Sequence, residues 1–574
     1  MSSTKDDEKQ KKAVRGQWRE NEKAHEPQIP DNNMWIVFPC IMGAVFLSAM
    51  DQTIVSTALA TISDELHASE AEYSWVGVAY MLTSTAMIPV VSKLGNIVGE
   101  KIIFLVGIVV FLLGSGLCGG AKSMIWLCTA RGVQGLGGGT IMASVQIIIS
   151  LITPLQSRGK FSGLIGSVWG VASLIGPLVG GAFTEHVNWN WCFFINLPIG
   201  GVVLIALIVF LKLNPKERPP YKEVLKQFDY IGLLSILTAA ICIIVGFSVA
   251  SSSTWKNPAV IALIVVGGVV LLFAGVWETY TTKSQIIPPR LFKTLTTSSI
   301  LFGTFFHAFG FFNGSYYLPL YFQVANESSP TLAGVELLPF SLGSSITSVL
   351  SGFLVARYKR YRPIIWCSWA VQIVGYALIT TLERDSNRAK QVLYLLVTAF
   401  GVGGLFQTPL LALQAAVPLA DMGLSTGAYV FVRSMAGTVA ISVGGTIMSN
   451  LTKKKLANIP DAGAMASSST EDLTGIKDIE PVELKLEIQQ AYSEAIATIF
   501  IVVVALIGVG LITSLFIKRY SMEVKNVKQG ETQEEDKEKQ DDKEKQTDIE
   551  GSSQITAAAA TESYEKQEKE KGTS

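Results

Sequence analysis

The sequence predicts an all-α polytopic membrane protein with fourteen transmembrane helices in a 6 + 2 + 6 arrangement. Only 16% of the 574 residues are charged, against about a quarter in soluble domains, and the mean hydropathy is +0.39. The charged residues gather at the two ends of the chain, and long apolar blocks separated by short polar loops lie between them. The formal net charge is zero and no basic face is present, so we expect no nucleic-acid partner.

Fourteen apolar blocks have the length of about 20 residues that a helix needs to cross a bilayer. The first six lie near 34–58, 73–95, 102–120, 123–150, 161–183 and 191–212. An extra pair lies near 229–250 and 257–279, and the last six lie near 298–322, 331–356, 363–382, 391–417, 424–449 and 493–517. Gly and Pro interrupt many blocks, which membrane helices tolerate when neighbouring helices satisfy the freed backbone groups.

The blocks divide the chain into five predicted regions. These are a disordered cytoplasmic tail (1–33), an N-terminal six-helix bundle (34–213), a linker with the extra helix pair (214–297), a C-terminal six-helix bundle (298–517) with an external loop at about 450–490, and a disordered cytoplasmic tail (518–574). The short inner loops carry sixteen Lys and Arg against five in the outer loops, which is the positive-inside pattern. The sequons at Asn326 and Asn450 then fall on the outer side and are glycosylation candidates.

Asp51 interrupts the apolar run of the first span, where a carboxylate costs about 2.5–3.5 kcal/mol. Arg131 lies deep in the fourth span, and at 1.5 Å per residue both charges are roughly 12–16 Å below the outer ends of their helices. We predict that they pair, because a pair offsets both insertion costs. A carboxylate beside an arginine changes its proton occupancy when the partner moves. Two readings remain open, proton coupling and a static ion pair.

Other polar side chains inside the spans are candidates for lining a transport cavity. They are Gln134, Gln146, His307, Gln407, Gln414 and Arg433. The glutamines serve equally well as hydrogen-bonding groups between helices, and for His307 a packing role is favoured over titration. Arg433 has no obvious acidic mate in the second half and would meet an anionic substrate or a helix C-terminus.

The fifth span is rich in glycine and contains one proline. Gly170, Gly176, Pro177, Gly180 and Gly181 mark it as a helix that packs closely and has the means to bend. Tight packing alone and bending at the seam between two halves are both open.

No catalytic constellation, nucleotide-binding Gly-x4-Gly-Lys loop or metal cluster appears in the sequence. We therefore predict a protein that is not an enzyme and that uses no cofactor and no metal.

These motifs resemble the major facilitator superfamily, in particular its fourteen-span fungal drug:proton antiporter branch. "MDQTIVSTAL" is similar to the first-span motif of that branch, "RGVQGLGGG" to its fourth-span motif, "GVASLIGPLVGG" to its fifth-span antiporter motif, and "WNWCFFINLPIG" to its sixth-span signature. The loop after the second span differs from the family's motif. Here Ser92, Asn96 and Glu100 replace the motif's first glycine, its aspartate and its arginine. In the family this loop latches the two halves together, so the latch here is expected to be weaker or built differently.

The resemblance implies two six-helix bundles that rock about a central cavity. It also implies proton-coupled export of toxic compounds, drugs or secondary metabolites across the plasma membrane, with Asp51 binding the proton and Arg131 resetting its affinity. The expected partners are a small-molecule substrate, protons and the lipid bilayer, and the expected state is a monomer. The alternatives are a transporter of the same fold for basic amino acids, siderophores or organic acids, at the vacuolar or plasma membrane, and a transporter-like receptor that signals through its tail.

Overall fold

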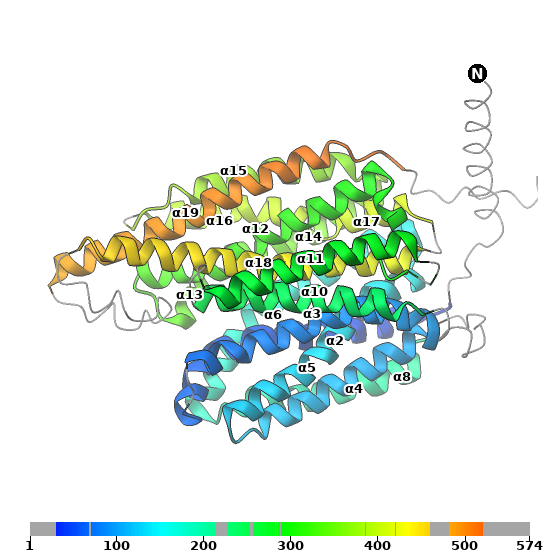
Figure 1. The fold of residues 1–574 in the computed structure, drawn as a ribbon, viewed down its shortest axis with the longest axis horizontal. Coiled ribbons are helices and arrows are strands. Elements are labelled where there is room, and N and C mark those ends of the chain that lie inside the picture. The colour runs from blue at the N-terminus through cyan, green and yellow to red at the C-terminus, as the bar shows by residue number, and fades with distance from the viewer. Residues whose placement is uncertain are drawn as a thin grey trace, which may run out of the picture. The chain divides into compact units, whose positions relative to one another are not determined.

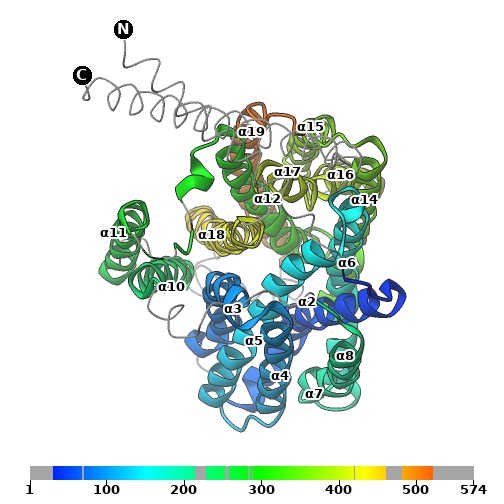
Figure 2. The same ribbon diagram turned by 90° about the vertical axis from the view of Figure 1, so that its right-hand side faces the viewer.

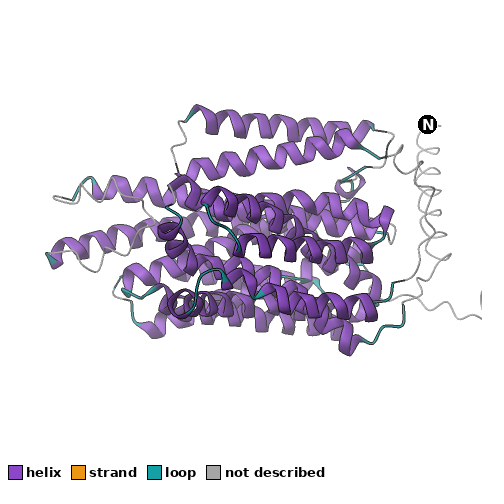
Figure 3. Ribbon diagram, turned by 90° about the horizontal axis from the view of Figure 1, so that it is seen from below, coloured by secondary structure: helices purple, strands orange, loops and turns teal. Residues whose placement is uncertain are grey.

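The computed structural model describes residues 30–67, 70–213, 228–252, 257–281, 283, 285–287, 289–384, 386–418, 421–459 and 481–520. The two tails predicted to be disordered lie almost entirely outside these residues. Helices and connecting loops make up the described part of the chain, with no strand in it (Figure 3). The predicted all-α class is therefore confirmed.

Every predicted span of the N-terminal half has a helical counterpart. The helices are α2 (Met34–Glu65), α3 (Glu70–Val98), α4 (Glu100–Gly119), α5 (Met124–Ile152), α6 (Leu155–His186), α7 (Trp191–Phe194) and α8 (Asn196–Phe210). The sixth span is divided between α7 and α8, which meet at Ile195. Apolar side chains of these helices form two buried clusters, which hold the N-terminal bundle together by close packing.

The C-terminal half repeats this pattern around its own apolar core. Its helices are α12 (Leu295–Ala325), α13 (Pro330–Glu336), α14 (Leu338–Tyr358), α15 (Arg362–Ile379), α16 (Arg388–Gly404), α17 (Thr408–Ala416), α18 (Met422–Leu456) and α19 (Val482–Ser514). One predicted span is interrupted between α16 and α17, at Leu405–Gln407. Pro409 lacks the backbone N–H that would continue the hydrogen-bond ladder, and a glycine-rich stretch precedes the break. We call Leu405–Gln407 the α16–α17 break.

The extra pair consists of α10 (Tyr230–Ser252) and α11 (Pro258–Tyr280), followed by the short helix η1 (Pro289–Phe292). Figure 2 shows the pair at the side of the two bundles, and α10 packs against α3 and α18. Only 17% of the apolar window of α11 is buried, so most of this helix presents Leu, Val and Phe side chains to its surroundings. A surface of this kind fits hydrocarbon and not water.

Thirteen helical segments of the described residues are long and apolar enough to cross a membrane, and two of these segments each combine two consecutive helices, α7 with α8 and α16 with α17. The remaining predicted span, near 161–183, falls in α6, which is not among the thirteen. With 32 residues, α6 is about 48 Å long, more than the roughly 30 Å of a bilayer core. The count of fourteen transmembrane helices remains a prediction.

The N-terminal and C-terminal helices form two groups, blue to cyan and green to orange in Figure 1. The seam between them is formed mainly by α6 against α14. Hydrogen bonds across the seam include Arg158 Nη1 to Gln414 Oε1 at 3.2 Å and a 2.6 Å bond between the hydroxyls of Thr85 and Ser434. The end of the bundles that carries Arg158, predicted to be cytoplasmic, is called the Arg158 end below.

The connection predicted at about 450–490 begins later and ends earlier in the structure. Helix α18 continues to Leu456 and α19 begins at Val482, while residues 460–480 lie outside the described part. Asn450 is therefore an exposed residue of α18 and not a loop residue. Three lysines, Lys453–Lys455, occupy the last turn of α18, where they complement the negative end of the helix dipole.

Candidate functional site

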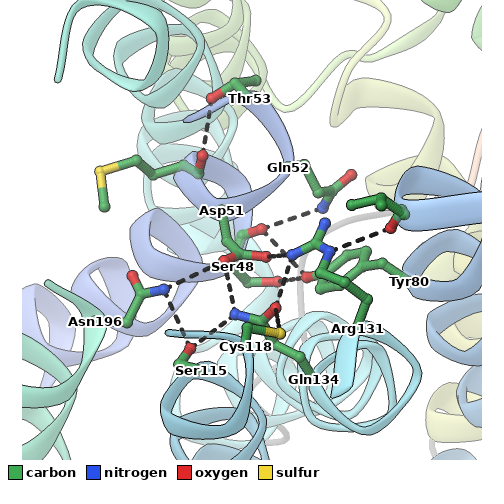
Figure 4. Close-up of polar contacts among 12 residues, drawn as sticks. Ser48, Asp51, Gln52, Thr53, Tyr80, Ser115, Cys118, Arg131, Gln134 and Asn196 are labelled. Atoms are coloured by element: carbon green, nitrogen blue, oxygen red, sulfur yellow. Dashed lines mark hydrogen bonds and ion pairs between the residues drawn. The ribbon is translucent and has the colours of Figure 1, made fainter. Parts of the chain in front are cut away.

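Asp51, in α2, lies at the centre of a buried polar network (Figure 4). Its Oδ2 forms an ion pair with Nη1 of Arg131 from α5, and the two side chains are 0% and 2% exposed. The predicted contact between these residues is confirmed. Each charge offsets the cost of burying the other, and the remaining hydrogen-bonding positions must be filled as well.

Gln134, one turn after Arg131 on α5, connects both charges. Its Nε2 donates to Asp51 Oδ1 at 2.6 Å and to Ser115 Oγ at 2.7 Å, and its Oε1 accepts from Arg131 Nη1 at 2.7 Å. Asn196 Nδ2 lies 3.2 Å from both Asp51 Oδ1 and Ser115 Oγ. The carboxylate thus accepts from an arginine and two amides, and these donors stabilise its charged form.

The sequence prediction missed two members of this network. Asn196 opens α8 and Ser115 belongs to α4, and both are fully buried. The signal for Asn196 was present, since an amide inside the apolar stretch "CFFINLPIG" needs a partner for the same reason as Asp51. Ser115 gave no such signal, because a small hydroxyl satisfies itself on its own helix backbone.

Two glycines allow the helices around the network to approach closely. A Cβ at Gly114 in α4 would meet the backbone of Gln134, and a Cβ at Gly135 in α5 would meet the backbone of Tyr80. Helices α3 and α4 therefore pack against α5 at a distance that only glycine permits. This packing sets the distances between the polar groups of the network.

Tyr80, from α3, packs against the arginine of the ion pair. The Arg131 guanidinium carbon is 4.5 Å from the centroid of the Tyr80 ring, and the Tyr80 hydroxyl is 3.0 Å from Ser48 Oγ. On its other side Tyr80 faces Gly138, where a Cβ would meet the hydroxyl. Gly138 lines the cavity described next, so Tyr80 contacts both Arg131 and a residue of the cavity wall, which includes neither Asp51 nor Arg131.

A cavity lies between the two bundles, with about 1000 Å³ of atom-free space that is partly open to solvent. The N-terminal half contributes α2, α3, α5 and α6 to its wall, and the C-terminal half contributes α12, the α16–α17 break and α18. Its walls come from both halves, so a movement of one half against the other would reshape it.

Three of the six candidate lining residues are in this wall. Gln146 comes from α5, Gln407 from the α16–α17 break and Arg433 from α18. Gln134 is not in the wall, because it lies on another face of α5, where its side chain forms hydrogen bonds within the Asp51 network. Gln52, the residue after Asp51, lines the cavity and was not among the candidates.

His307 and Gln414 lie outside the wall as well. His307 Nε2 is 3.0 Å from the carbonyl oxygen of Val402, and its ring packs against aromatic side chains, so it holds a place in the C-terminal core. Gln414 accepts from Arg158 across the seam and donates to Thr426 Oγ1 at 3.2 Å. Its position makes it a contact between halves and not a wall residue.

The glycine motif of α6 lies at the seam. A Cβ at Gly170 would meet Ser345 of α14, and one at Gly176 would meet Thr53 of α2. Thr53 Oγ1 donates to the carbonyl oxygen of Ala172 at 3.1 Å, which ties the Asp51 helix to α6. The helix continues without interruption through Pro177, Gly180 and Gly181, and Gly180 accepts from Thr184 at 2.7 Å.

The second-span loop, which departs from the family motif, contacts the linker. Lys93 is 6% exposed, and its Nζ donates to the carbonyl oxygen of Gln285 at 2.9 Å. Further along the linker, Arg290 pairs with Asp421 just before α18 at 2.6 Å. The linker after α11 is thus attached to both halves.

Two helical bundles around a cavity, with apolar surfaces facing outward and a buried acid–base pair inside, define a polytopic membrane transporter. The chain belongs to the Major Facilitator Superfamily, whose family model matches residues 41–441.

Curated relatives cover most of the chain. An uncharacterized MFS-type transporter of Schizosaccharomyces pombe is 37% identical over 89% of this chain and 85% of its own. The efflux pump dotC of Dothistroma septosporum is 34% identical over 85% of each chain, and the efflux pump FUS6 of Gibberella fujikuroi is 31% identical over 87% of this chain and 91% of its own. The chain is therefore similar to fungal efflux pumps along nearly its whole length.

Solved structures share the fold. The human organic anion transporter MFSD10 matches with a TM-score of 0.54 at 12% identity, covering 83% of this chain and 100% of its own. A bacterial homolog of the human lysosomal transporter Spinster, in an inward-facing occupied state, matches with a TM-score of 0.51 at 15% identity, covering 84% and 96%. At such identities the likeness concerns the fold alone.

Proposed function

We propose that this chain is a proton-coupled efflux transporter that exports toxic compounds, drugs or secondary metabolites by alternating access. The relatives named as efflux pumps support the direction of transport. The cavity between the two bundles supports a site that opens first to one side and then to the other. The proposed location is the plasma membrane, with the vacuolar membrane as the alternative, and the proposed state is a monomer.

The observation that carries proton coupling is the buried Asp51 carboxylate with its three side-chain donors. While Arg131 stays in contact, the charged carboxylate is stabilised and binds no proton. When Arg131 withdraws, a buried carboxylate without its cation takes up a proton, because burial favours the neutral form. A proton at Asp51 and the contact with Arg131 therefore exclude each other.

Two contacts support communication between Asp51 and the moving parts. Gln52, next in sequence, lines the cavity, so substrate binding reaches the same turn of α2. Thr53 joins this turn to α6 at the seam through Ala172. A shift of α6 against α14 would therefore move this turn of α2 and change the geometry of the ion pair.

The test uses purified full-length protein in proteoliposomes with an imposed pH gradient and a panel of fluorescent cytotoxic compounds. We expect the wild type to accumulate compounds against their gradient, and Asp51→Asn to lose this pH-driven accumulation while it keeps exchange of substrate without a gradient. Asp64→Asn, an exposed carboxylate on the same helix, is the matched control and should behave as wild type. Full pH-driven accumulation by Asp51→Asn would overturn the assignment.

Among the alternative substrates, Arg433 in the cavity wall favours organic acids over basic amino acids. Arg433 places a positive charge in the cavity wall, which repels basic amino acids and attracts organic acids. Export of acidic compounds is therefore compatible with the efflux proposal. Microscopy of a tagged copy distinguishes the plasma membrane from the vacuolar membrane.

A further inference from the structure

The wall of the central cavity carries a single charged side chain, Arg433 of α18. All other described residues of the wall are apolar side chains, glycines or uncharged polar side chains. No Asp or Glu forms an ion pair with Arg433 within the described residues. The contrast with Arg131 is direct, since that arginine has a carboxylate and an amide as partners.

The contacts that Arg433 makes among the described residues include no carboxylate. Its Nη1 donates to the carbonyl oxygen of Phe406 at 3.2 Å, its guanidinium carbon lies 4.4 Å from the Phe406 ring centroid, and its side chain also interacts with the neutral hydroxyl of Tyr429. Phe406 follows the last turn of α16, whose C-terminus contributes about half a negative charge. The Phe406 carbonyl and the negative end of α16 compensate this cation only in part, so it can attract an anion within the cavity.

Gln407 supplies a second unfilled position beside the first. The α16–α17 break turns this residue into the cavity wall, where it is 3% exposed. Its Oε1 is buried and accepts no hydrogen bond from the described residues. A buried acceptor without a donor destabilises the site, and a ligand hydroxyl or N–H would recover that loss.

Aromatic rings surround these two polar groups. Phe311 and Phe312 of α12 line the cavity with ring centroids 5.2 Å apart, and Phe311 packs edge-on against Phe406 at 4.8 Å. Trp169 of α6 lines the wall from the N-terminal half. A flat apolar or aromatic body fits between such walls, because ring edges and faces pack favourably against it.

We propose that Arg433 and Gln407 form an anion-recognition subsite, and that the substrates of this transporter are organic acids with a flat aromatic or apolar body. The carboxylate, enolate or phenolate oxygen pairs with the Arg433 guanidinium, and a neighbouring hydroxyl donates to Gln407 Oε1. The inference rests on the proposed function only in taking this cavity as the transport site.

Binding without any pH gradient tests the subsite separately from proton coupling. The probes are hydroxynaphthoate and anthracene carboxylate, each compared with its neutral carboxamide, and the protein is the full chain in nanodiscs. Quenching of tryptophan fluorescence reports binding. We expect wild type to bind at least one acid about tenfold more tightly than its amide, and Arg433→Gln to bind the two alike.

Three further variants make the result specific. Arg433→Lys keeps a charge but loses the planar donor fork, so part of the preference for the acid should remain. Gln407→Leu should weaken hydroxynaphthoate more than anthracene carboxylate, because only the former carries the hydroxyl. Gln146→Leu alters the wall of the other half and should change acid and amide alike.

Equal binding of acid and amide by wild type for both pairs would overturn the proposal, as would an acid preference that survives in Arg433→Gln. If Arg433→Gln does not elute as a monodisperse protein, the decision passes to Arg433→Lys and Gln407→Leu, and unchanged selectivity in both then counts against the subsite. Failure of pH-driven flux with intact acid selectivity would remove the proton-coupling proposal and leave this one standing.

Discussion

Replacing Gln134 by leucine tests whether the network around Asp51 is a stabilising unit. The substitution removes one hydrogen bond to the Asp51 carboxylate and one from the Arg131 guanidinium, each about 1.5–3 kcal/mol, and one neutral bond to Ser115 of about 1 kcal/mol. The larger apolar surface of leucine returns about 1–2 kcal/mol. The expected net loss is about 2–6 kcal/mol of unfolding free energy.

Gln146→Leu is the matched control, because it makes the same chemical change on the same helix. The side chain of Gln146 lines the cavity and forms no hydrogen bond with another described residue, so its loss should cost less than about 1 kcal/mol. Thermal unfolding of both variants in nanodiscs, followed by loss of the monodisperse elution peak, gives the comparison. We expect Gln134→Leu to unfold well below wild type and Gln146→Leu close to it.

Two outcomes would refute this reasoning. One is a Gln134→Leu protein as stable as wild type, which would mean that the network contributes no net stability. The other is equal destabilisation by both substitutions, which would mean that any amide lost from α5 has the same effect. Gln146→Leu should change transport although it leaves the stability close to that of wild type, because it alters the cavity wall without weakening the fold.

Three further predictions concern the seam and the surface. Gly170→Ala should lower the transport rate more than tenfold, because its Cβ meets α14, while Gly77→Ala, with open space around it, should transport as wild type in the same proteoliposome assay. Arg158→Ala removes the contacts with α17 and α18. A loss of about 1 kcal/mol should shift the population about fivefold toward a state that is open at the Arg158 end. The shift is measured as faster labelling of a single cysteine in the cavity. Unchanged labelling would exclude Arg158 as a gate contact. Asn450→Gln should abolish a glycosidase-sensitive shift in electrophoretic mobility and Asn326→Gln should not, because Asn450 is exposed whereas the Asn326 amide already donates two hydrogen bonds.

Much of the candidate site follows from residue chemistry and helix arithmetic. A lone aspartate and a lone arginine within apolar runs must find partners, and counting 1.5 Å per residue places them at the same depth. Their contact is present in the structure. The same rule applied to Asn196 would have extended the network, because its amide is equally costly to bury alone.

Counting residues along a helix could not show which glutamine faces the Asp51 network and which faces the cavity. Gln134 and Gln146 are 12 residues apart on α5, which rotates them by about 120° around the helix. One face meets Asp51 and Ser115, and the other meets the cavity. Both look alike in the sequence, since periodicity gives the angle between two side chains but not the neighbour that each one faces.

The sequence by itself determined that this protein is a bundle of membrane-length helices and that Asp51 and Arg131 need each other, because the cost of burying polar groups in hydrocarbon leaves few other arrangements. Only the tertiary structure decided that this pair lies against Tyr80 and outside the cavity wall, and that Arg433 lines the cavity with no acid paired to it among the described residues. Those facts depend on how close α3, α4 and α5 approach and on where α16 breaks, and such distances are set by packing between helices far apart in the chain.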